Sequence, residues 1–84
     1  MERSEVFTTL KNAAVEVLGV EPDAVTEAAR FKEDLEADSL DLVELTVELE
    51  DTYGIRIPDE QAARILTVGQ AADYVAAHAE DSES

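Results

Sequence analysis

The chain has 84 residues, and its 21 acidic and 6 basic residues give a formal net charge of −15. This balance argues against a nucleic-acid-binding role, because phosphate contacts need Lys and Arg, and it disfavours an anionic membrane surface. Cysteine is absent and no metal-ligand cluster is evident in the sequence, so aliphatic residues must build the core of one small domain.

No targeting or membrane segment is evident in the sequence. The N-terminus lacks a basic stretch followed by an apolar run, which predicts that there is no secretory signal. No window approaches the roughly 18 apolar residues of a membrane span. We therefore expect a soluble, cytoplasmic and monomeric protein, with one domain over residues 1–79 and a disordered acidic tail over residues 80–84.

The first predicted element is an amphipathic helix over residues 4–18, with Ser4 as its N-cap and Gly19 in the left-handed position that ends many helices. Its apolar residues recur at three- and four-residue steps, and they are Phe7, Leu10, Ala14, Val17 and Leu18. A connection of about 20 residues then runs to Ser39, which is long for a compact domain. The residues spaced to anchor it are Val20, Val25, Phe31 and Leu35, and residues 23–28 could form one helical turn.

The second predicted helix runs from Ser39 or Leu40 to Tyr53 and ends at Gly54. Residues 55–58 are then extended, because a residue that precedes proline avoids helical angles. Asp59 is expected to cap a brief third helix that reaches residue 64.

A fourth helix begins at a capping box formed by Thr67 and Gln70. The residues that share its predicted buried face are Val68, Ala71, Ala72, Val75 and Ala79. Together the elements predict an all-α fold, a small four-helix bundle of three longer helices and one short helix with a long first loop.

The helix that begins near Ser39 carries two apolar faces, whereas folding needs only one. At about 100° per residue, its core face holds Leu42, Leu45, Thr46, Leu49 and Tyr53. A narrow strip on nearly the opposite side holds Leu40, Val43 and Val47, and carboxylates flank it at Asp41, Glu44, Glu48, Glu50 and Asp51. Single exposed valines are common and need no explanation. An apolar strip with a uniformly acidic rim nevertheless favours docking of a partner that presents Arg and Lys.

Ser39 lies between two carboxylates where the loop becomes this helix. A serine nucleophile needs a base and an oxyanion hole, and the single histidine of the chain, His78, belongs to the end of the fourth helix. We therefore predict no catalytic residue. A structural alternative is that Asp38 or Ser39 only caps the helix.

A calcium loop is another interpretation of the acidic cluster. Asp34, Glu36 and Asp38 could occupy the first positions of an EF-hand. However, Ser39 replaces its glycine and Leu45 stands where its bidentate glutamate belongs, so no metal site is predicted.

The run Asp38-Ser39-Leu40-Asp41, with Leu35 before it and Val43-Glu44-Leu45 after it, resembles the prosthetic-group site of acyl carrier proteins. The similarity continues through Leu49-Glu50, Tyr53-Gly54-Ile55, Ile57-Pro58-Asp59-Glu60 and Thr67-Val68, and it covers roughly residues 4–79. The resemblance implies that Ser39 receives a 4′-phosphopantetheine arm from coenzyme A through a separate phosphopantetheinyl transferase (holo-ACP synthase). The thiol of that arm would carry acyl chains as thioesters, and the protein itself would be no enzyme.

The same resemblance implies a partner face and a cavity between helices for the acyl chain. The positions that match acidic docking residues are Asp38, Asp41, Glu44, Glu50 and Asp51, and those that match apolar contacts are Leu40, Val43 and Val47. Three residues depart from the family pattern. Glu36 replaces a common glycine and is expected to stiffen the loop, Glu48 narrows the apolar strip, and Thr46 slightly polarises the cavity.

The function that we expect is delivery of acyl thioesters to fatty acid synthesis enzymes with basic docking patches. One alternative is the same carrier chemistry in a polyketide or other specialised acyl pathway. A more distant alternative is an unmodified acidic helical module that binds a basic protein or a divalent cation.

Overall fold

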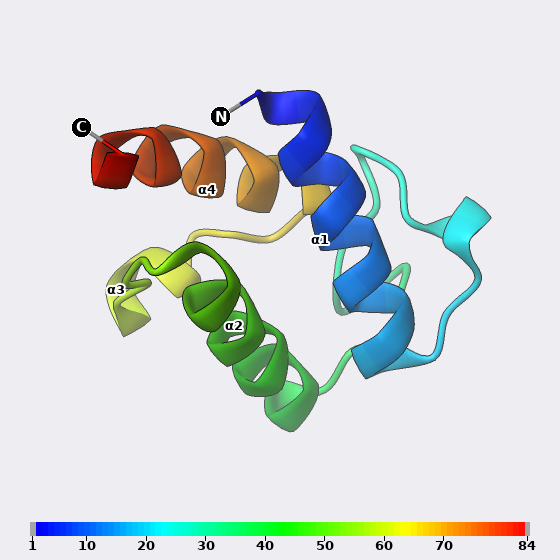
Figure 1. The fold of residues 1–84 in the computed structure, drawn as a ribbon. Helices are drawn as coiled ribbons and strands as arrows, with labels where there is room; N and C mark the ends of the chain where they lie inside the picture. The colour runs from blue at the N-terminus through cyan, green and yellow to red at the C-terminus, as the bar shows by residue number, and fades with distance from the viewer. Residues whose placement is uncertain (1, 84) are drawn as a thin grey trace.

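The computed structural model describes residues 2–83, with side chains through residue 79. This part of the chain holds four α-helices and one 3-10 turn, in the order α1 (Arg3–Leu18), η1 (Pro22–Ala24), α2 (Ser39–Tyr53), α3 (Asp59–Ala62) and α4 (Val68–Glu83). The long helices α1, α2 and α4 surround one core, and α3 lies beside α2 (Figure 1). Between residues 2 and 83 no strand is formed, only an isolated antiparallel bridge between Arg30 and Thr67. The predicted all-α four-helix bundle is confirmed.

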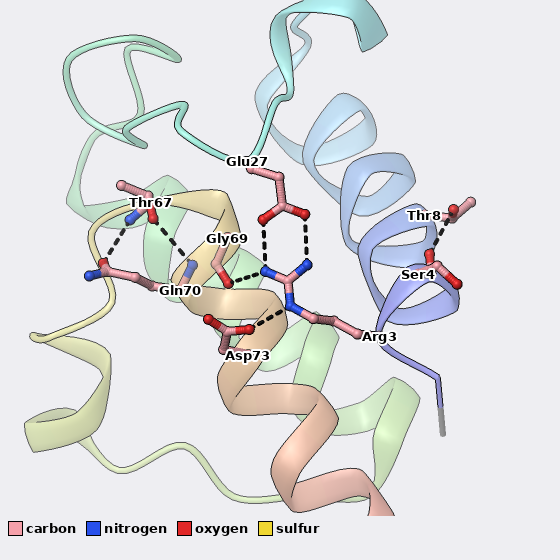
Figure 2. Close-up of polar contacts among 8 residues, drawn as sticks. All are labelled: Arg3, Ser4, Thr8, Glu27, Thr67, Gly69, Gln70 and Asp73. Atoms are coloured by element: carbon pink, nitrogen blue, oxygen red, sulfur yellow. Dashed lines mark hydrogen bonds and ion pairs between the residues drawn. The ribbon is translucent and has the colours of Figure 1, made fainter.

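Several helix ends lie where the sequence predicts them. Gly19 and Gly54 follow α1 and α2 with φ of 69° and 65°, a left-handed conformation that costs glycine little because it has no Cβ. Before α4, the Gln70 N–H donates to Thr67 Oγ1 and the Thr67 N–H donates to Gln70 Oε1, each at 3.2 Å (Figure 2). These two reciprocal bonds are the predicted capping box.

The predicted starts of α1 and α3 were wrong. Glu2, not Ser4, is the N-cap residue of α1, and the Ser4 carbonyl instead accepts a hydrogen bond from the Thr8 hydroxyl at 3.0 Å. Pro58, not Asp59, is the N-cap residue of α3, and Asp59 is already helical. Neither helix has a side-chain cap, so the hydroxyl and carboxylate signatures misplaced both starts by one or two residues.

Two other boundaries also differ from those predicted. The helical turn expected within residues 23–28 is the 3-10 turn Pro22–Ala24, because the fixed φ of proline suits the first helical position. At the other end of the chain α4 continues through Glu83, past the expected domain limit at residue 79. The last residue of the predicted tail, Ser84, lies outside the described residues.

The core is built almost entirely from small and branched aliphatic side chains. Val6, Leu10, Val68 and Val75 are its largest fully buried side chains. On α4 every residue of the predicted buried face is at most 3 % exposed. On α1, however, Val6 is fully buried and Phe7 only partly, so the buried face of this helix is rotated slightly from the predicted one.

The long first loop is held in place by apolar anchors and by backbone pairing. Of its predicted anchors, Val25, Phe31 and Leu35 are 2–4 % exposed and Val20 is half-buried. The Phe31 N–H donates to the Leu66 carbonyl at 3.1 Å, and two amides at the start of α4 donate back to carbonyls of the loop. The loop therefore carries an ordered backbone up to Ser39, although it is long.

Arg3 ties three distant segments together (Figure 2). Its guanidinium makes two bonds of 2.7 Å to the Glu27 carboxylate in the long loop, and it also donates to Asp73 and, at 3.0 Å, to the Gly69 carbonyl, both in α4. The bidentate pair is charge-assisted and fixes the geometry of both groups. Bonding to Arg3 lowers the pKa of Glu27, and the two carboxylates raise the pKa of Arg3.

None of the described helices is long and apolar enough to cross a bilayer.

Candidate functional site

The start of α2 is fixed by two aspartates on either side of Ser39. Asp38 is the N-cap: its Oδ1 accepts from the Asp41 N–H at 2.9 Å, and Asp41 Oδ2 accepts from the Asp38 N–H at 3.3 Å. The pair satisfies two backbone amides reciprocally, which stabilises the first turn. Asp38 therefore caps the helix, and Ser39 occupies the first helical position without that task.

The Ser39 side chain is exposed and available for chemistry carried out by another molecule. Among the described residues, its hydroxyl makes no hydrogen bond. His78, the one histidine, belongs to α4, where its ring stacks on Tyr74 and its Nδ1 lies 2.9 Å from the Tyr74 carbonyl. In the part of the chain that the structure describes, no base is bonded to the Ser39 hydroxyl in the way that a serine nucleophile needs.

The loop that leads to Ser39 has two tightly constrained acidic residues. Asp34 Oδ2 accepts from the Arg30 backbone N–H at 2.8 Å and from its guanidinium at 3.4 Å, and these bonds lower the pKa of Asp34. Glu36 adopts a φ of 57°, in the left-handed region that favours glycine. A non-glycine residue there costs on the order of 1–2 kcal/mol. Among the residues whose side chains the structure describes, no three His, Asp or Glu residues form a group suited to hold a metal ion.

The second apolar face of α2 is exposed, as predicted. Leu40, Val43 and Val47 are 77 %, 60 % and 48 % exposed, and we call these three residues the α2 strip. The carboxylates of Asp38, Glu44 and Asp51 are exposed around it. This surface presents apolar area inside a negatively charged rim.

Three of the predicted partner carboxylates, those of Asp38, Asp41 and Glu50, have bonds within the molecule. Asp41 is half-buried and completes the capping box with Asp38. Glu50 is also half-buried, and its Oε2 accepts from the Ile57 N–H at 2.7 Å. Among the predicted partner residues, Glu44 and Asp51 are therefore the exposed carboxylates of the rim that make no bond within the described part of the chain.

A cavity of about 700 Å³ opens between α2, α3 and the segment that joins them. Its lining reaches from Ser39 to α4 and is mostly apolar; it includes Phe31, Leu42, Leu45, Leu49, Ile57, Ile65, Ala71 and Val75. Thr46 also lines it, with its hydroxyl bonded to the Leu42 carbonyl at 2.8 Å. A mostly apolar pocket of this size is suited to a small apolar ligand or chain.

The sequence predicted the position of Ser39 at the start of α2 and the exposure of the α2 strip, but it did not predict much of the cavity lining. Arg56, Ile57 and Pro58 line it from the segment between α2 and α3, and Phe31 lines it from the long loop. Their burial depends on how the chain closes and not on a helical period. The run from Ile55 to Pro58, which is extended and contains two isoleucines, was the available signal for a packed segment.

Comparison with known proteins places this geometry in a family. The family model described as a phosphopantetheine attachment site matches residues 8–75. An acyl carrier protein from Rubrobacter xylanophilus is 51 % identical over 78 residues, which cover 93 % of this chain and 96 % of that protein. A solved structure of the acyl carrier protein from Enterococcus faecalis is 40 % identical, with a TM-score of 0.79 over 93 % of this chain and 99 % of that one.

Proposed function

The chain belongs to the acyl carrier protein family, and on this premise we propose that it carries acyl chains on a phosphopantetheine arm attached to Ser39 for fatty acid synthesis. The observation that carries the proposal is Ser39 itself, an exposed hydroxyl at the first position of α2 and at the edge of the cavity. Residues 1–79 form the carrier domain in this proposal, and the protein acts as a cytoplasmic substrate shuttle without catalysis of its own.

The surroundings of Ser39 fit the attachment of a phosphodiester. The amides at the start of a helix and the helix dipole favour an anionic group there. Asp38 already bonds the Asp41 amide, so the Ser39 hydroxyl is not needed to hold the helix start and is free to be modified. The arm supplies a terminal thiol that holds an acyl group as a thioester.

In the proposed modification, Ser39 Oγ forms the new bond to phosphorus. The pyrophosphate bond of coenzyme A breaks, and its nucleotide half leaves. The proton of the Ser39 hydroxyl passes to a base on the phosphopantetheinyl transferase, since the Asp38 and Asp41 carboxylates are bonded to backbone amides and neither is bonded to this hydroxyl. The apolar cavity next to Ser39 then provides a place for the acyl chain away from water.

The α2 strip and its acidic rim are the proposed docking face for the transferase and the synthesis enzymes. A partner with a shallow apolar surface surrounded by Arg and Lys complements it. Because exposed rim charges mainly raise the association rate, docking is expected to be fast and weak, as delivery to several partners requires. We include Asp38, Leu40, Asp41, Val43, Glu44, Val47, Glu50 and Asp51 in this face, with the exposed members as its main contacts.

Mass spectrometry after incubation with coenzyme A, magnesium and a phosphopantetheinyl transferase tests the proposal. We expect one added arm on the wild type and none on Ser39→Ala. We also expect slower loading of Glu44→Lys with an unchanged circular dichroism spectrum, because Glu44 is exposed and contributes charge to the rim. A wild-type protein that stays unmodified while a control carrier is loaded would refute the carrier function.

The pathway is tested with the loaded protein. We expect ketosynthases of fatty acid synthesis to elongate the acyl group on the loaded protein at a higher rate than ketosynthases of a polyketide pathway do. The reverse order of rates would support the alternative that the carrier serves a specialised acyl pathway.

A further inference from the structure

One wall of the cavity is a short segment without regular structure. Gly54 to Pro58 join α2 to α3, and Arg56, Ile57 and Pro58 line the cavity. The side chains of Ile55 and Ile57 are 9 % and 7 % exposed, so the segment is packed on the core. A segment of this kind lacks the repeated hydrogen bonds of a helix, and a few side-chain bonds therefore decide how firmly it is held.

Among the residues whose side chains the structure describes, two make side-chain bonds to this segment, and both bonds meet at a single peptide unit. The Tyr74 hydroxyl in α4 donates to the Arg56 carbonyl at 3.1 Å. The Glu50 carboxylate in α2 accepts from the Ile57 N–H at 2.7 Å. The Arg56 carbonyl and the Ile57 N–H are the two ends of the same planar amide, so this peptide plane is bonded at both ends to different helices.

The donor and the acceptor are themselves held in place. Glu50 is half-buried and lines the cavity, unlike the exposed carboxylates of Glu44 and Asp51 on the same helix. The Tyr74 ring stacks on the His78 ring with their centroids 3.9 Å apart. The Tyr74 side chain is therefore ordered by a contact that does not involve the segment, and partial burial restricts the Glu50 side chain, which lowers the entropic cost of the two bonds.

We propose that Glu50 and Tyr74 are positioning residues that hold the Gly54–Pro58 wall of the cavity in place through their hydrogen bonds to the Arg56–Ile57 peptide unit. These two bonds determine how well the cavity holds an acyl chain. Glu50 then has a role inside the carrier in addition to its place at the edge of the docking face. The inference rests on the proposed carrier function in one respect, which is that the molecule held in the cavity is an acyl chain.

Amide hydrogen exchange of Ile57 in the unmodified protein tests whether these two bonds hold the segment, without any assumption about function. Glu50→Ala removes the acceptor and is expected to speed exchange of this amide by about tenfold or more, which corresponds to about 1.4 kcal/mol. Glu50→Gln keeps an acceptor of the same shape and is expected to have a smaller effect. Glu44→Ala is the matched control, an exposed carboxylate of the same helix, and should leave the exchange of Ile57 unchanged.

The other end of the peptide is tested by Tyr74→Phe, which removes only the hydroxyl. Because both bonds hold the same amide, the effects of Glu50→Gln and Tyr74→Phe on Ile57 exchange should not be additive. Unchanged Ile57 exchange in Glu50→Ala would overturn the proposed positioning role. Strictly additive effects in the double variant Glu50→Gln/Tyr74→Phe would also overturn it.

The consequence for the acyl chain is measured on protein loaded with an octanoyl arm. A chain that occupies the folded cavity raises Tm relative to the arm alone. We expect Glu50→Ala to lose at least about half of that gain in Tm and Glu44→Ala to keep it. Equal gains in the two variants would overturn the link to cargo. A protein that cannot be loaded would refute the carrier function instead, while the exchange of Ile57 would still decide whether Glu50 holds the wall.

Discussion

Gly69 stands at the second position of α4, where the helix is hydrogen-bonded to the backbone of the long loop. Its N–H donates to the Glu27 carbonyl at 2.9 Å, and its own carbonyl accepts from Arg3. A methyl group added here would lie 2.9 Å from the Glu27 carbonyl oxygen and 2.7 Å from Glu27 Oε1. The first of these atoms belongs to the backbone and the second is bonded to Arg3, so neither can move away without breaking another contact.

Two effects of Gly69→Ala on stability oppose each other. Intrinsic helix propensity favours alanine over glycine by about 1 kcal/mol. Forcing an extra methyl group into a packed site costs about 1–3 kcal/mol. The clash with backbone places this site at the upper end of that range, so we expect Gly69→Ala to lower the free energy of unfolding by about 1–2 kcal/mol. At about 4–8 °C for each kcal/mol in a domain of this size, Tm should fall by roughly 4–16 °C.

Thermal and urea unfolding, followed by circular dichroism, measure the change. Ala77→Gly is the control, because Ala77 is exposed in the same helix and reports propensity alone, with an expected loss of about 1 kcal/mol. If Gly69→Ala instead raised Tm by an amount similar to that which Ala77→Gly lowers it, propensity would dominate. The close approach of α4 to the loop would then be refuted.

Two further predictions concern a hydroxyl and a carboxylate. The Tyr53 hydroxyl is buried without a hydrogen-bond partner in the described part of the chain, so Tyr53→Phe should raise the free energy of unfolding by about 1–2 kcal/mol in urea titrations; a decrease would show that the hydroxyl is bonded in solution. Because Arg3 lowers the pKa of Glu27 from 4.5, the stability contributed by this carboxylate is present above pH 4.5 and is lost as the pH falls below it. The Tm advantage of the wild type over Glu27→Gln should therefore shrink on acidification, and an advantage independent of pH would contradict the ion pair.

The features that the sequence predicted well depend on short-range patterns. The period of about 3.6 residues identified the buried face of α4, and the residues around Ser39 identified the start of α2. The opposing faces of α2 followed from the same period, because Leu45 and Leu49 are buried whereas Leu40 is exposed. Each of these inferences needs only the geometry of one helix.

The features that the sequence did not predict depend on how distant segments meet. Arg3 finds its partners at separations of 24 to 70 residues, and nothing in its local sequence distinguishes it from an exposed arginine. The same holds for Glu50, which local spacing placed among the docking carboxylates although it bonds the Ile57 amide. The left-handed backbone of Glu36 was hidden because the residue type disfavours it.

The contacts of Arg3 determine where the N-terminal boundary of a shortened carrier domain can be placed. The family match begins at residue 8, so a minimal module designed from that boundary would lack the first turn of α1. It would lose the buried side chain of Val6 and the partly buried side chain of Phe7. The loop carboxylate of Glu27 and the start of α4 would also lose their shared cation. A fusion protein that carries this domain should therefore retain Arg3 and place its linker before it.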